Sequence, residues 1–355
     1  MKIAVLTSGG VDSSVALKLL KDQGHDVTAY YLKIWLEDEL QHLADCPWEE
    51  DLQYVREICE REKIPLKIIP MQKEYFDTVV SYTLKEVKAG RTPNPDIMCN
   101  NHIKFGMFFE KIDLNQFDKV ATGHYANIEE QNGQFILKKT DDPIKDQTYF
   151  LARLSQEQLS KIIFPLAPYT KKEVRELAHK FNLPNKDRKD SQGICFLGKF
   201  KYNDFIKHYL GEIPGDIIES ETGKKLAEHE GFFYYTIGQR KGIGIGGIKS
   251  GDGRPFYVVD KDIEKNIIYV SNEYHEKTRN TLEVGDFNWF SGEFPSKRNL
   301  QVKLRHGENF YNCEITNVSP NHATLTLDGS DQGIATGQFA VFYDGEICLG
   351  SGVIV

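Results

Sequence analysis

Short apolar runs alternate with longer amphipathic stretches over the first 200 residues of the chain. The short runs are typical of strands, and we place these at 3–6, 26–32, 66–69 and 119–122. The longer stretches carry apolar residues at helical spacing, which predicts helices at 15–20, 49–63, 73–89 and 100–111. A chain that alternates strands and helices in this way builds a parallel sheet with helices on both faces.

The pattern changes after residue 200, where short strands and turns replace the helices. Turn signals stand at 221–223, and a glycine-rich stretch covers 238–253. From residue 281 onward the pattern predicts short strands at 301–305, 311–318, 323–327, 338–343 and 347–355. Such strands are typical of a small antiparallel barrel. We therefore expect an α/β fold with a parallel-sheet catalytic domain at 1–200, a small linking domain at 201–278 and an antiparallel β-barrel at 279–355.

The composition is that of an ordinary globular protein. Of the 355 residues, 40% are hydrophobic and 27% are charged, and no apolar run is long enough to span a bilayer. The first residues form a core strand rather than a signal peptide, so we expect a cytoplasmic location and no membrane partner. The net charge of −8 argues against a protein that binds nucleic acids without regard to sequence, but it allows a local basic groove. The six cysteines include no Cys-x-x-Cys pair, which predicts neither a metal site nor a disulfide scaffold.

A glycine turn joins the first strand to the first helix, and it reads Ser-Gly-Gly-Val-Asp-Ser-Ser at 8–14. Adjacent glycines let backbone N–H groups turn inward, and the helix start adds partial positive charge, so the turn favours phosphate binding. No Gly-Lys-Ser or Gly-Lys-Thr follows, so this is not a Walker A loop. It resembles the PP-loop of the ATP pyrophosphatases, which split ATP into AMP and pyrophosphate. The alternative is a plain turn in which Asp12 or Ser13 caps the helix.

Two cysteines lie in polar, turn-rich surroundings that favour the reactive thiolate. Cys99 directly precedes the helix predicted at 100–111, whose dipole would stabilise a thiolate. The cations that flank Cys195 are Arg188, Lys189, Lys199 and Lys201. The cysteines at 46, 59, 313 and 348 are expected to be small buried apolar residues.

A phosphate loop together with two candidate thiolates suggests a reaction in two stages. ATP would activate an oxygen by adenylation, and a sulfur carried on one cysteine would then displace AMP. A persulfide must lose its terminal sulfur, and a second thiol can release that sulfur by forming a disulfide. Because Cys99 and Cys195 are far apart in the sequence, this hypothesis requires the fold to bring them together.

Further motifs follow the phosphate loop in order along the chain. They are Ala-Gly-Arg-Thr-Pro-Asn-Pro-Asp-Ile-Met-Cys-Asn at 89–100, Ala-Thr-Gly-His-Tyr at 121–125, Lys-Asp-Gln-Thr-Tyr-Phe-Leu at 145–151, Asp-Ser-Gln-Gly-Ile-Cys-Phe at 190–196, Thr-Ile-Gly-Gln-Arg-Lys-Gly at 236–242 and Gly-Gln-Phe-Ala-Val-Phe-Tyr at 337–343. Together with the loop at 8–14, these blocks resemble the tRNA-specific 2-thiouridylases over nearly the whole chain. Any single block would mean little, but so many in register are specific.

The resemblance implies an activity, cofactors and partners. The activity is ATP-dependent 2-thiolation of the wobble uridine of tRNA, with adenylation of the uracil C2 oxygen and sulfur transfer from a cysteine persulfide. AMP and pyrophosphate are released. The implied cofactors are ATP and Mg²⁺, and the implied partners are tRNA and a sulfur-donor protein, which is either a relay protein or a cysteine desulfurase.

The same resemblance implies roles for individual residues. ATP binding falls on Leu6, Thr7, Ser8, Gly9, Gly10, Val11, Asp12, Ser13, Leu32 and Gly123. Cys99 becomes the nucleophile, Cys195 the persulfide carrier that forms a disulfide with it, and Asp96 a general acid or base. Contacts with tRNA fall on Asn94, Pro95, Asp96, His124, Lys145, Asp146, Gln147, Arg305, His306 and Gln338. The chain departs from the family's usual residues at Leu6-Thr7, at Leu32 and at His306.

Chemistry on the edge of a base requires that base to leave its stack, and an anticodon loop already presents unstacked bases. We expect a discontinuous basic rim to meet the tRNA phosphates. Its members are Lys138, Lys139, Lys145, Lys171, Lys172, Lys186, Arg188, Lys189, Lys199, Lys201, Arg240 and Lys241.

Two other functions are compatible with the sequence. The first is a PP-loop ligase that adenylates a carboxylate or carbonyl and passes it to an amine, which would need no cysteine pair. The second is a non-catalytic protein that binds RNA and keeps ATP as a structural ligand. Substitution of Cys99 or Cys195 tests the first alternative, and tRNA-dependent release of pyrophosphate tests the second.

Overall fold

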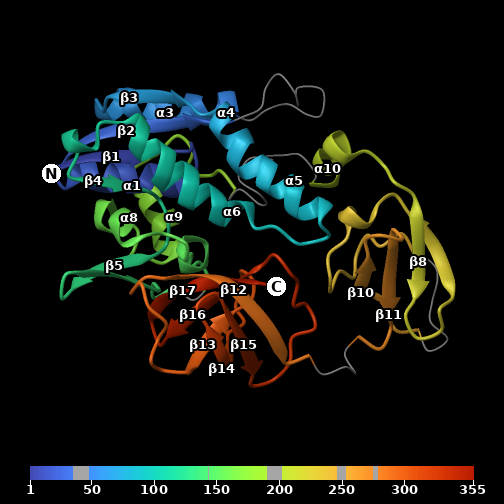
Figure 1. Cartoon of the computed structure of the whole chain (residues 1–355). Helices are drawn as coiled ribbons and strands as arrows, with labels where there is room; N and C mark the ends of the chain where they lie inside the picture. Colours follow the sequence, from blue (N-terminus) through green and yellow to red (C-terminus); the bar gives the residue numbers. More distant parts are fainter. Residues whose placement is uncertain (35–47, 143, 190–201, 246–252, 275–278) are drawn as a thin grey trace.

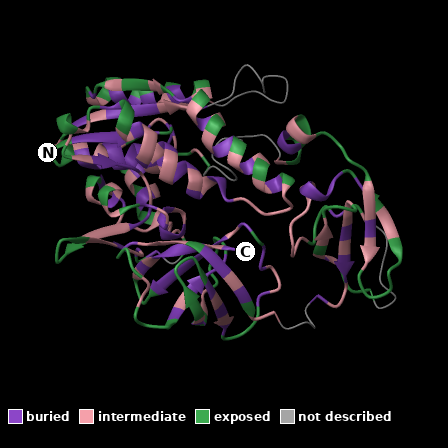
Figure 2. Ribbon diagram, viewed as in Figure 1, coloured by how far each residue is buried: buried purple, intermediate pink, exposed green. Residues whose placement is uncertain are grey.

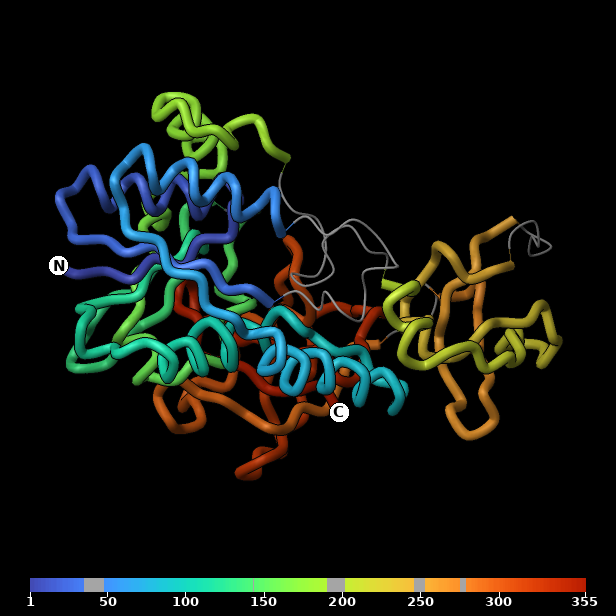
Figure 3. The backbone as a smooth tube through the Cα atoms, turned by 90° about the horizontal axis from the view of Figure 1, so that it is seen from above, coloured from blue at the N-terminus to red at the C-terminus, as the bar shows by residue number. Residues whose placement is uncertain are grey.

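The structure is a computed structural model that describes residues 1–34, 48–142, 144–189, 202–245, 253–274 and 279–355. It contains an N-terminal α/β domain, a small β-rich middle domain and a C-terminal β-barrel (Figure 1). The barrel lies against the N-terminal domain, and the middle domain stands to one side of both (Figure 3). This arrangement confirms the predicted fold class of a parallel-sheet domain, a smaller domain and an antiparallel barrel.

The N-terminal domain is built on a parallel sheet with the strand order β3-β2-β1-β4-β7. Its strands are β1 (Lys2–Leu6), β2 (Asp26–Lys33), β3 (Leu66–Pro70), β4 (Lys119–Ala121) and β7 (Ile162–Ile163). Successive side chains of β1 enter different cores, because Ala4 packs in the hydrophobic cluster on one face and Ile3 in the cluster on the other. Figure 2 shows the buried residues concentrated on these central strands. The predicted strands are therefore confirmed.

Helices cover both faces of this sheet. The cluster on one face includes residues of α1 (Val11–Asp22), α3 (Trp48–Glu62) and α9 (Lys171–Lys180). The cluster on the other face includes residues of α4 (Gln72–Tyr75), η1 (Phe76–Val80), α5 (Ser81–Lys88), η2 (Cys99–Met107) and α7 (Phe108–Lys111). The remaining helices are α6 (Pro95–Met98), α8 (Gln156–Lys161), α10 (Tyr202–Leu210) and the short turns η3 (Leu114–Gln116), η4 (Thr148–Leu151) and η5 (Phe232–Tyr234).

The helix expected to begin at Asn100 begins earlier, so that prediction is wrong at its N-terminal end. Pro95 occupies the first helical turn, and the side-chain oxygen of Asn94 accepts a hydrogen bond from the N–H of Ile97 at 3.2 Å. Asparagine is a favoured N-cap and proline is favoured at the first helical position, so both residues place the start at 95. Cys99 therefore lies one turn inside a helical stretch that runs to Lys111.

The C-terminal domain is a closed antiparallel barrel. Its strands are β12 (Thr281–Trp289), β13 (Asn299–Lys303), β14 (Tyr311–Ser319), β15 (His322–Leu327), β16 (Phe339–Asp344) and β17 (Ile347–Ile354). They follow the order β12-β15-β14-β13-β16-β17, and pairing of β12 with β17 closes the barrel. Closure leaves no exposed edge strand in the ring.

A hairpin from the N-terminal domain extends the barrel sheet. Its strands are β5 (Asn127–Gln131) and β6 (Gln134–Lys138), and β6 pairs with β17 through Leu137 opposite Cys348. The sequence analysis placed no strands here. The hairpin joins the two domains into one packed unit, because Leu137, Tyr149 and Val341 share a hydrophobic cluster.

The middle domain contains β8 (Gly215–Glu219), β9 (Lys225–His229), β10 (Tyr257–Asp262) and β11 (Ile267–Ser271) in the order β10-β11-β8-β9. Its core residues, such as Ile217 and Val258, belong to the same hydrophobic cluster as one face of the N-terminal sheet. Within the described ranges, no helix is both long enough and apolar enough to cross a membrane.

Candidate active site

The turn between β1 and α1 is a tight glycine loop. Gly9 has a φ of +77°, and a Cβ at this position would lie 2.5 Å from the carbonyl oxygen of Asp51, so only glycine fits. The N-cap of α1 is Gly10, so the alternative in which Asp12 or Ser13 caps the helix is wrong. Instead, the Ser13 hydroxyl accepts a hydrogen bond from the N–H of Ser8 at 3.2 Å and donates to the Gly10 carbonyl at 3.1 Å. These bonds hold the loop in a fixed shape at the start of a helix, which is the geometry of an anion site.

Two residues near the end of the described N-terminal domain, Asn185 and Arg188, donate hydrogen bonds to this loop. The buried Asn185 donates from its side-chain nitrogen to the carbonyl of Gly9 at 2.8 Å and to the Ser14 hydroxyl at 2.9 Å. Arg188 also donates to the Gly9 carbonyl, at 3.2 Å, and forms an ion pair with Asp51 at 2.5 Å. The sequence analysis missed Asn185, for which the chain offers no local signal, and assigned Arg188 to the tRNA rim.

Asp12 lies in the first turn of α1 and is held by partners from two other elements. The Lys171 ammonium lies 2.6 Å from one carboxylate oxygen of Asp12 and 2.8 Å from the other. The Tyr125 hydroxyl donates to the same carboxylate at 3.0 Å. Lys171 was also expected in the tRNA rim, but its ammonium contacts the loop itself.

Gly123 closes one side of the loop. It follows β4, which pairs directly with β1, so the carboxyl ends of the two strands are neighbours. A Cβ on Gly123 would lie 2.7 Å from the backbone nitrogen of Ser13 and 2.8 Å from the carbonyl carbon of Asp12. Predicted ATP-binding residues from two distant parts of the sequence thus meet at this sheet edge, where ligands of open α/β sheets bind. The other predicted members beside the loop, Leu6, Thr7 and Val11, are buried.

Leu32 lies in β2, next to β1, and is half-buried. Tyr30, which lies in β2 like Leu32, accepts a hydrogen bond at its carbonyl from the Thr7 hydroxyl at 3.1 Å. The end of β2 therefore stands beside the loop, as the prediction for Leu32 requires.

His124 connects the loop to the helical stretch that carries Cys99. Its Nδ1 lies 2.7 Å from the Thr122 hydroxyl, and its ring centroid lies 6.1 Å from that of Phe105 in η2. Burial, together with the nearby Lys104 ammonium, holds the pKa of His124 well below its usual range. The side chain is therefore neutral at physiological pH and offers a polar contact rather than a positive charge.

Cys99 differs from the sequence expectation in two respects. It is 1% exposed and packs in an apolar cluster with Leu6 and Ile103, rather than standing in polar surroundings. It also lies inside the helix rather than at its first turn, so the helix dipole stabilises a thiolate less than we expected. Asp96, on the preceding turn, is half-buried. Cys195 and the loop around it lie outside the described residues.

Both smaller domains contact the segment that leads into Asn94. The Gln338 side-chain nitrogen, from the barrel, donates to the carbonyls of Thr92 and Pro93 at 3.1 and 3.0 Å. A Cβ on Gly90, at the end of the preceding helix, would lie 2.5 Å from the Cδ1 of Ile263 in the middle domain. The helix start that presents Asn94, Pro95 and Asp96 is thus positioned by all three domains.

The segment Lys145-Asp146-Gln147 is also held from within the protein. Asp146 is 4% exposed, accepts from the Thr148 hydroxyl at 2.8 Å and lies 3.9 Å from the ammonium of the buried Lys303 in the barrel. Burial raises the pKa of Asp146, and these two partners oppose that rise. The Gln147 side-chain oxygen accepts from the N–H of Tyr125 at 3.0 Å. Lys145, the first residue of this segment, is half-buried.

Arg305 and His306 lie on the exposed rim of the barrel beside this segment. The Arg305 guanidinium makes a bidentate ion pair with Asp331 at 2.9 and 2.7 Å, which fixes its orientation while half of the side chain stays exposed. The His306 ring lies 4.6 Å from the ring of Phe150, centroid to centroid.

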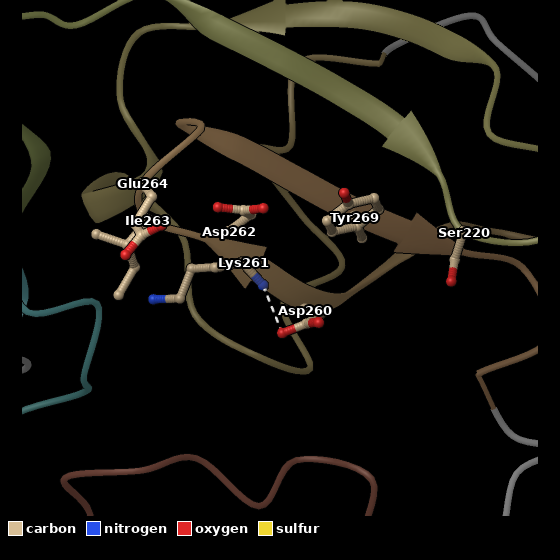
Figure 4. A pocket seen from close by; sticks show the side chains of 7 residues that line it. All are labelled: Ser220, Asp260, Lys261, Asp262, Ile263, Glu264 and Tyr269. Carbon is tan, nitrogen blue, oxygen red and sulfur yellow. Dashed lines mark hydrogen bonds between the residues drawn. The ribbon is translucent and has the colours of Figure 1, made fainter.

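A cavity of about 610 Å³ lies in the middle domain, far along the chain from the phosphate loop. Figure 4 shows the residues that line it, which are Ser220, Asp260, Lys261, Asp262, Ile263, Glu264 and Tyr269. Burial lowers the pKa of Lys261 to about 8, and its ammonium donates to the carbonyl of Tyr235 at 3.0 Å. None of these residues belongs to the predicted site.

Three family models match the chain in sequence order. They are described as a tRNA methyl transferase HUP domain at residues 1–199, a tRNA methyl transferase PRC-barrel domain at 203–272 and an aminomethyltransferase beta-barrel domain at 279–354. The first of these agrees with the parallel sheet and the glycine loop at its edge. The fold and the site thus define a protein of the HUP class.

Curated relatives narrow the class. The chain is 46% identical to a tRNA-specific 2-thiouridylase of Parabacteroides distasonis, and the match covers 100% of this chain and 99% of the relative. It is 44% identical to a protein of the same description from Bacteroides thetaiotaomicron and 43% identical to one from Porphyromonas gingivalis, again over 100% of this chain and 99% of each relative. The chain belongs to the tRNA-specific 2-thiouridylase family and is an enzyme of that family.

Proposed function

We propose that this protein converts a uridine at the wobble position of tRNA to 2-thiouridine, using ATP and a sulfur delivered as a cysteine persulfide. The observation that carries the proposal is the meeting of two segments at one sheet edge. Gly123 packs on the phosphate loop, and its neighbour His124 packs on Phe105 of the helical stretch that begins at Pro95 and carries Asp96 and Cys99. A nucleotide at the loop would therefore lie beside the helix that presents the predicted catalytic residues.

ATP is proposed to bind with its phosphates at the Ser8–Ser13 loop, where the start of α1 favours negative charge. Mg²⁺ commonly binds to one or two carboxylates together with substrate phosphates, and Asp12, whose side chain is 31% exposed, suits that role. In the described part of the chain no three metal-ligating acidic, histidine or cysteine side chains cluster, so the phosphates would complete the ion's coordination. The bound ion would neutralise phosphate charge.

The proposed chemistry has two substitutions at the uracil. The C2 oxygen attacks the α-phosphorus of ATP, the bond to the bridging oxygen breaks, and pyrophosphate leaves with the electron pair. Asp96 takes the proton from N3 of the base. The terminal sulfur of a Cys195 persulfide then attacks C2, and AMP leaves with the electrons of the carbon–oxygen bond.

The second cysteine completes the transfer. The Cys99 thiolate attacks the Cys195 sulfur of the mixed species, so that the sulfur–sulfur bond to the base breaks and a Cys99–Cys195 disulfide forms. The thiolated base takes its electron pair and recovers the proton at N3 from Asp96. A dithiol reductant then restores both thiols, and a sulfur-donor protein reloads Cys195.

The tRNA is proposed to bind across the N-terminal domain and the barrel. Lys145, Arg305 and His306 lie exposed or half-exposed along that boundary and suit phosphate or sugar contacts. His124, Asn94 and Pro95 would meet the target base, whereas Asp146, Gln147 and Gln338 would position these contacts through the internal bonds described above. We place the three domains at 1–200, 201–278 and 279–355, and we propose that the enzyme works in the cytoplasm.

The test is mass spectrometry of tRNA after incubation with the protein, ATP, Mg²⁺, a persulfide sulfur donor and a dithiol reductant. We expect a gain of one sulfur for one oxygen in the anticodon wobble nucleoside, with one AMP and one pyrophosphate released for each modified tRNA. Pyrophosphate release without tRNA, or release with no change in the nucleoside mass, would contradict the proposal. The first outcome would indicate a ligase with another substrate, and an absence of release would indicate a non-catalytic RNA-binding protein.

Replacing Gly123 by alanine should weaken ATP binding by roughly tenfold to a hundredfold, the range expected when overpacking costs about 1–3 kcal/mol. The new Cβ would overlap the backbone of Asp12 and Ser13, so the phosphate loop would have to move. Isothermal titration with ATP measures the effect. Gly24→Ala is the control for an added methyl group, because no described atom lies within 4 Å of its added Cβ. Gly24 has a φ of +81°, unlike Gly123, so any backbone strain falls on the control and not on the tested position. Equal ATP affinities for the two variants would contradict the assignment of Gly123.

A further inference from the structure

Lys171 brings a positive charge to the phosphate loop from a helix far along the chain. It is the first residue of α9, whose N-cap Thr170 forms a capping box with Glu173. The backbone N–H of Lys171 donates to the buried carboxylate of Asp142 at 2.8 Å, which fixes the start of the helix. The Lys171 side chain is 15% exposed and ends at the Asp12 carboxylate. α9 lies beside α1 in the fold, so this contact is built into the packing of two helices (Figure 1).

The charges at the loop suggest a function for Lys171. The loop has no lysine of its own, unlike a Walker A loop, and it carries the negative charge of Asp12 at the point where phosphates would bind. Arg188 also contacts the loop, but its guanidinium is bound to Asp51 and to the carbonyl of Gly9. Arg188 thus stabilises the backbone of the loop, whereas the Lys171 ammonium contacts the Asp12 carboxylate.

We propose that Lys171 binds the β- and γ-phosphates of ATP and stabilises the pyrophosphate that leaves. This inference rests on the proposed function. When the bond between the α-phosphorus and its bridging oxygen breaks, the electron pair passes to the departing pyrophosphate, and a fixed ammonium beside it stabilises that growing charge. The residue would thus do the work that the lysine of a Walker A loop does from within the loop.

Asp12 keeps a hydrogen-bond donor when Lys171 turns toward a phosphate. The Tyr125 hydroxyl donates to the Asp12 carboxylate at 3.0 Å and would remain its partner. A lysine ammonium is a compact charge on a flexible stem with three donor hydrogens, so it can move between neighbouring acceptors by rotation of its side chain. Lys171 is therefore suited to neutralise Asp12 before ATP binds and to serve the phosphates afterwards.

The test compares Lys171→Met and Lys171→Arg with Lys180→Met. Lys180 is exposed on the last turn of the same helix, so its loss controls for charge and helix effects. Binding of inorganic pyrophosphate, ATP and AMP is measured by titration. For Lys171→Met we expect the affinities for pyrophosphate and ATP to fall about tenfold to a hundredfold, the range for one charge-assisted hydrogen bond, and the affinity for AMP to change less than about twofold. Lys171→Arg should recover part of the loss.

A role in shaping the loop through Asp12 would give a different result. AMP and pyrophosphate would then weaken together, and Lys171→Met would add nothing to the effect of Asp12→Asn on pyrophosphate release, which would overturn the inference. An unmodified enzyme that fails to bind ATP would instead contradict the proposed function. An active unmodified enzyme, with Lys171→Met equal to Lys180→Met, would overturn this inference alone. Thermal melting of each variant identifies any that does not fold.

Discussion

Replacing either Cys99 or Cys195 by serine is expected to abolish 2-thiouridine formation while the first turnover of pyrophosphate release continues. Adenylation uses ATP and the base, whereas sulfur transfer and release need both thiols, because a serine hydroxyl neither carries a persulfide nor attacks one under these conditions. We expect thiolation to fall by at least about a thousandfold, since removal of a covalent nucleophile has effects of this order. The assay is single-turnover: sulfur content of the tRNA by mass spectrometry, and pyrophosphate released per bound tRNA.

Cys59→Ala is the matched control for these two variants. Cys59 is a buried cysteine on α3, and burial raises its pKa to about 11, so it is an inert thiol by environment. Its variant should thiolate tRNA at a rate close to that of the unmodified protein. If the serine variants at 99 and 195 also retained thiolation, the cysteine mechanism would be refuted and the amide-forming ligase would become the better explanation.

The burial of Cys99 leads to a further expectation about its reactivity. A side chain that is 1% exposed and packed among apolar residues cannot react with a sulfur in bulk solvent. Under the proposed mechanism, the Cys195 sulfur that Cys99 attacks must therefore reach it within the protein, away from bulk solvent. Thiol reagents should modify Cys99 slowly in the protein without tRNA, and this can be checked by peptide mass spectrometry in the same experiment.

Asp12→Ala is expected to lower tRNA-dependent pyrophosphate release by about a hundredfold to a thousandfold, the range seen when one preorganised electrostatic group is lost. The substitution leaves the Lys171 ammonium and the Tyr125 hydroxyl without their shared acceptor, so both groups lose the geometry that they have at the loop. It also removes the carboxylate proposed to hold Mg²⁺. Affinity for tRNA should change less than about twofold, because Asp12 is on the nucleotide side of the sheet edge.

Asp22→Ala controls for the charge and the helix in this experiment. Asp22 lies at the other end of α1, where it is exposed and pairs with Lys18. Exposed ion pairs of this kind contribute roughly 0–1 kcal/mol, so the control should keep its activity. Pyrophosphate release by Asp12→Ala at the control's rate would remove Asp12 from the mechanism. A matching loss of tRNA affinity would show that the substitution disturbs more than the nucleotide site.

The centre of the N-terminal sheet could be predicted because β1 is buried from Ile3 to Leu6 and β2 is largely buried. Residues 3–6, for example, are continuously apolar, and such a run followed by a glycine turn is a local pattern that needs no distant partner to be recognised. The helix start at Pro95 is equally local, because the N-cap Asn94 and the proline at the first helical position are adjacent in the sequence. The hairpin β5–β6 has a local signal as well, since Asn132-Gly133 forms its two-residue turn with φ of +53° and +78°. Only the pairing of β6 with β17 depends on a segment far along the chain.

The elements of the N-terminal sheet, the glycine loop and the family motifs follow from local sequence, since each depends on neighbouring residues. The folded arrangement is needed to see which cations contact the loop, because the Lys171–Asp12 pair joins residues 159 positions apart and the Gln338–Thr92 bond joins residues 246 apart. It also decided that Cys99 is buried and that Asp146 is bound inside the protein. Long-range contacts of this kind depend on how whole elements pack, and no local pattern of residue types specifies them.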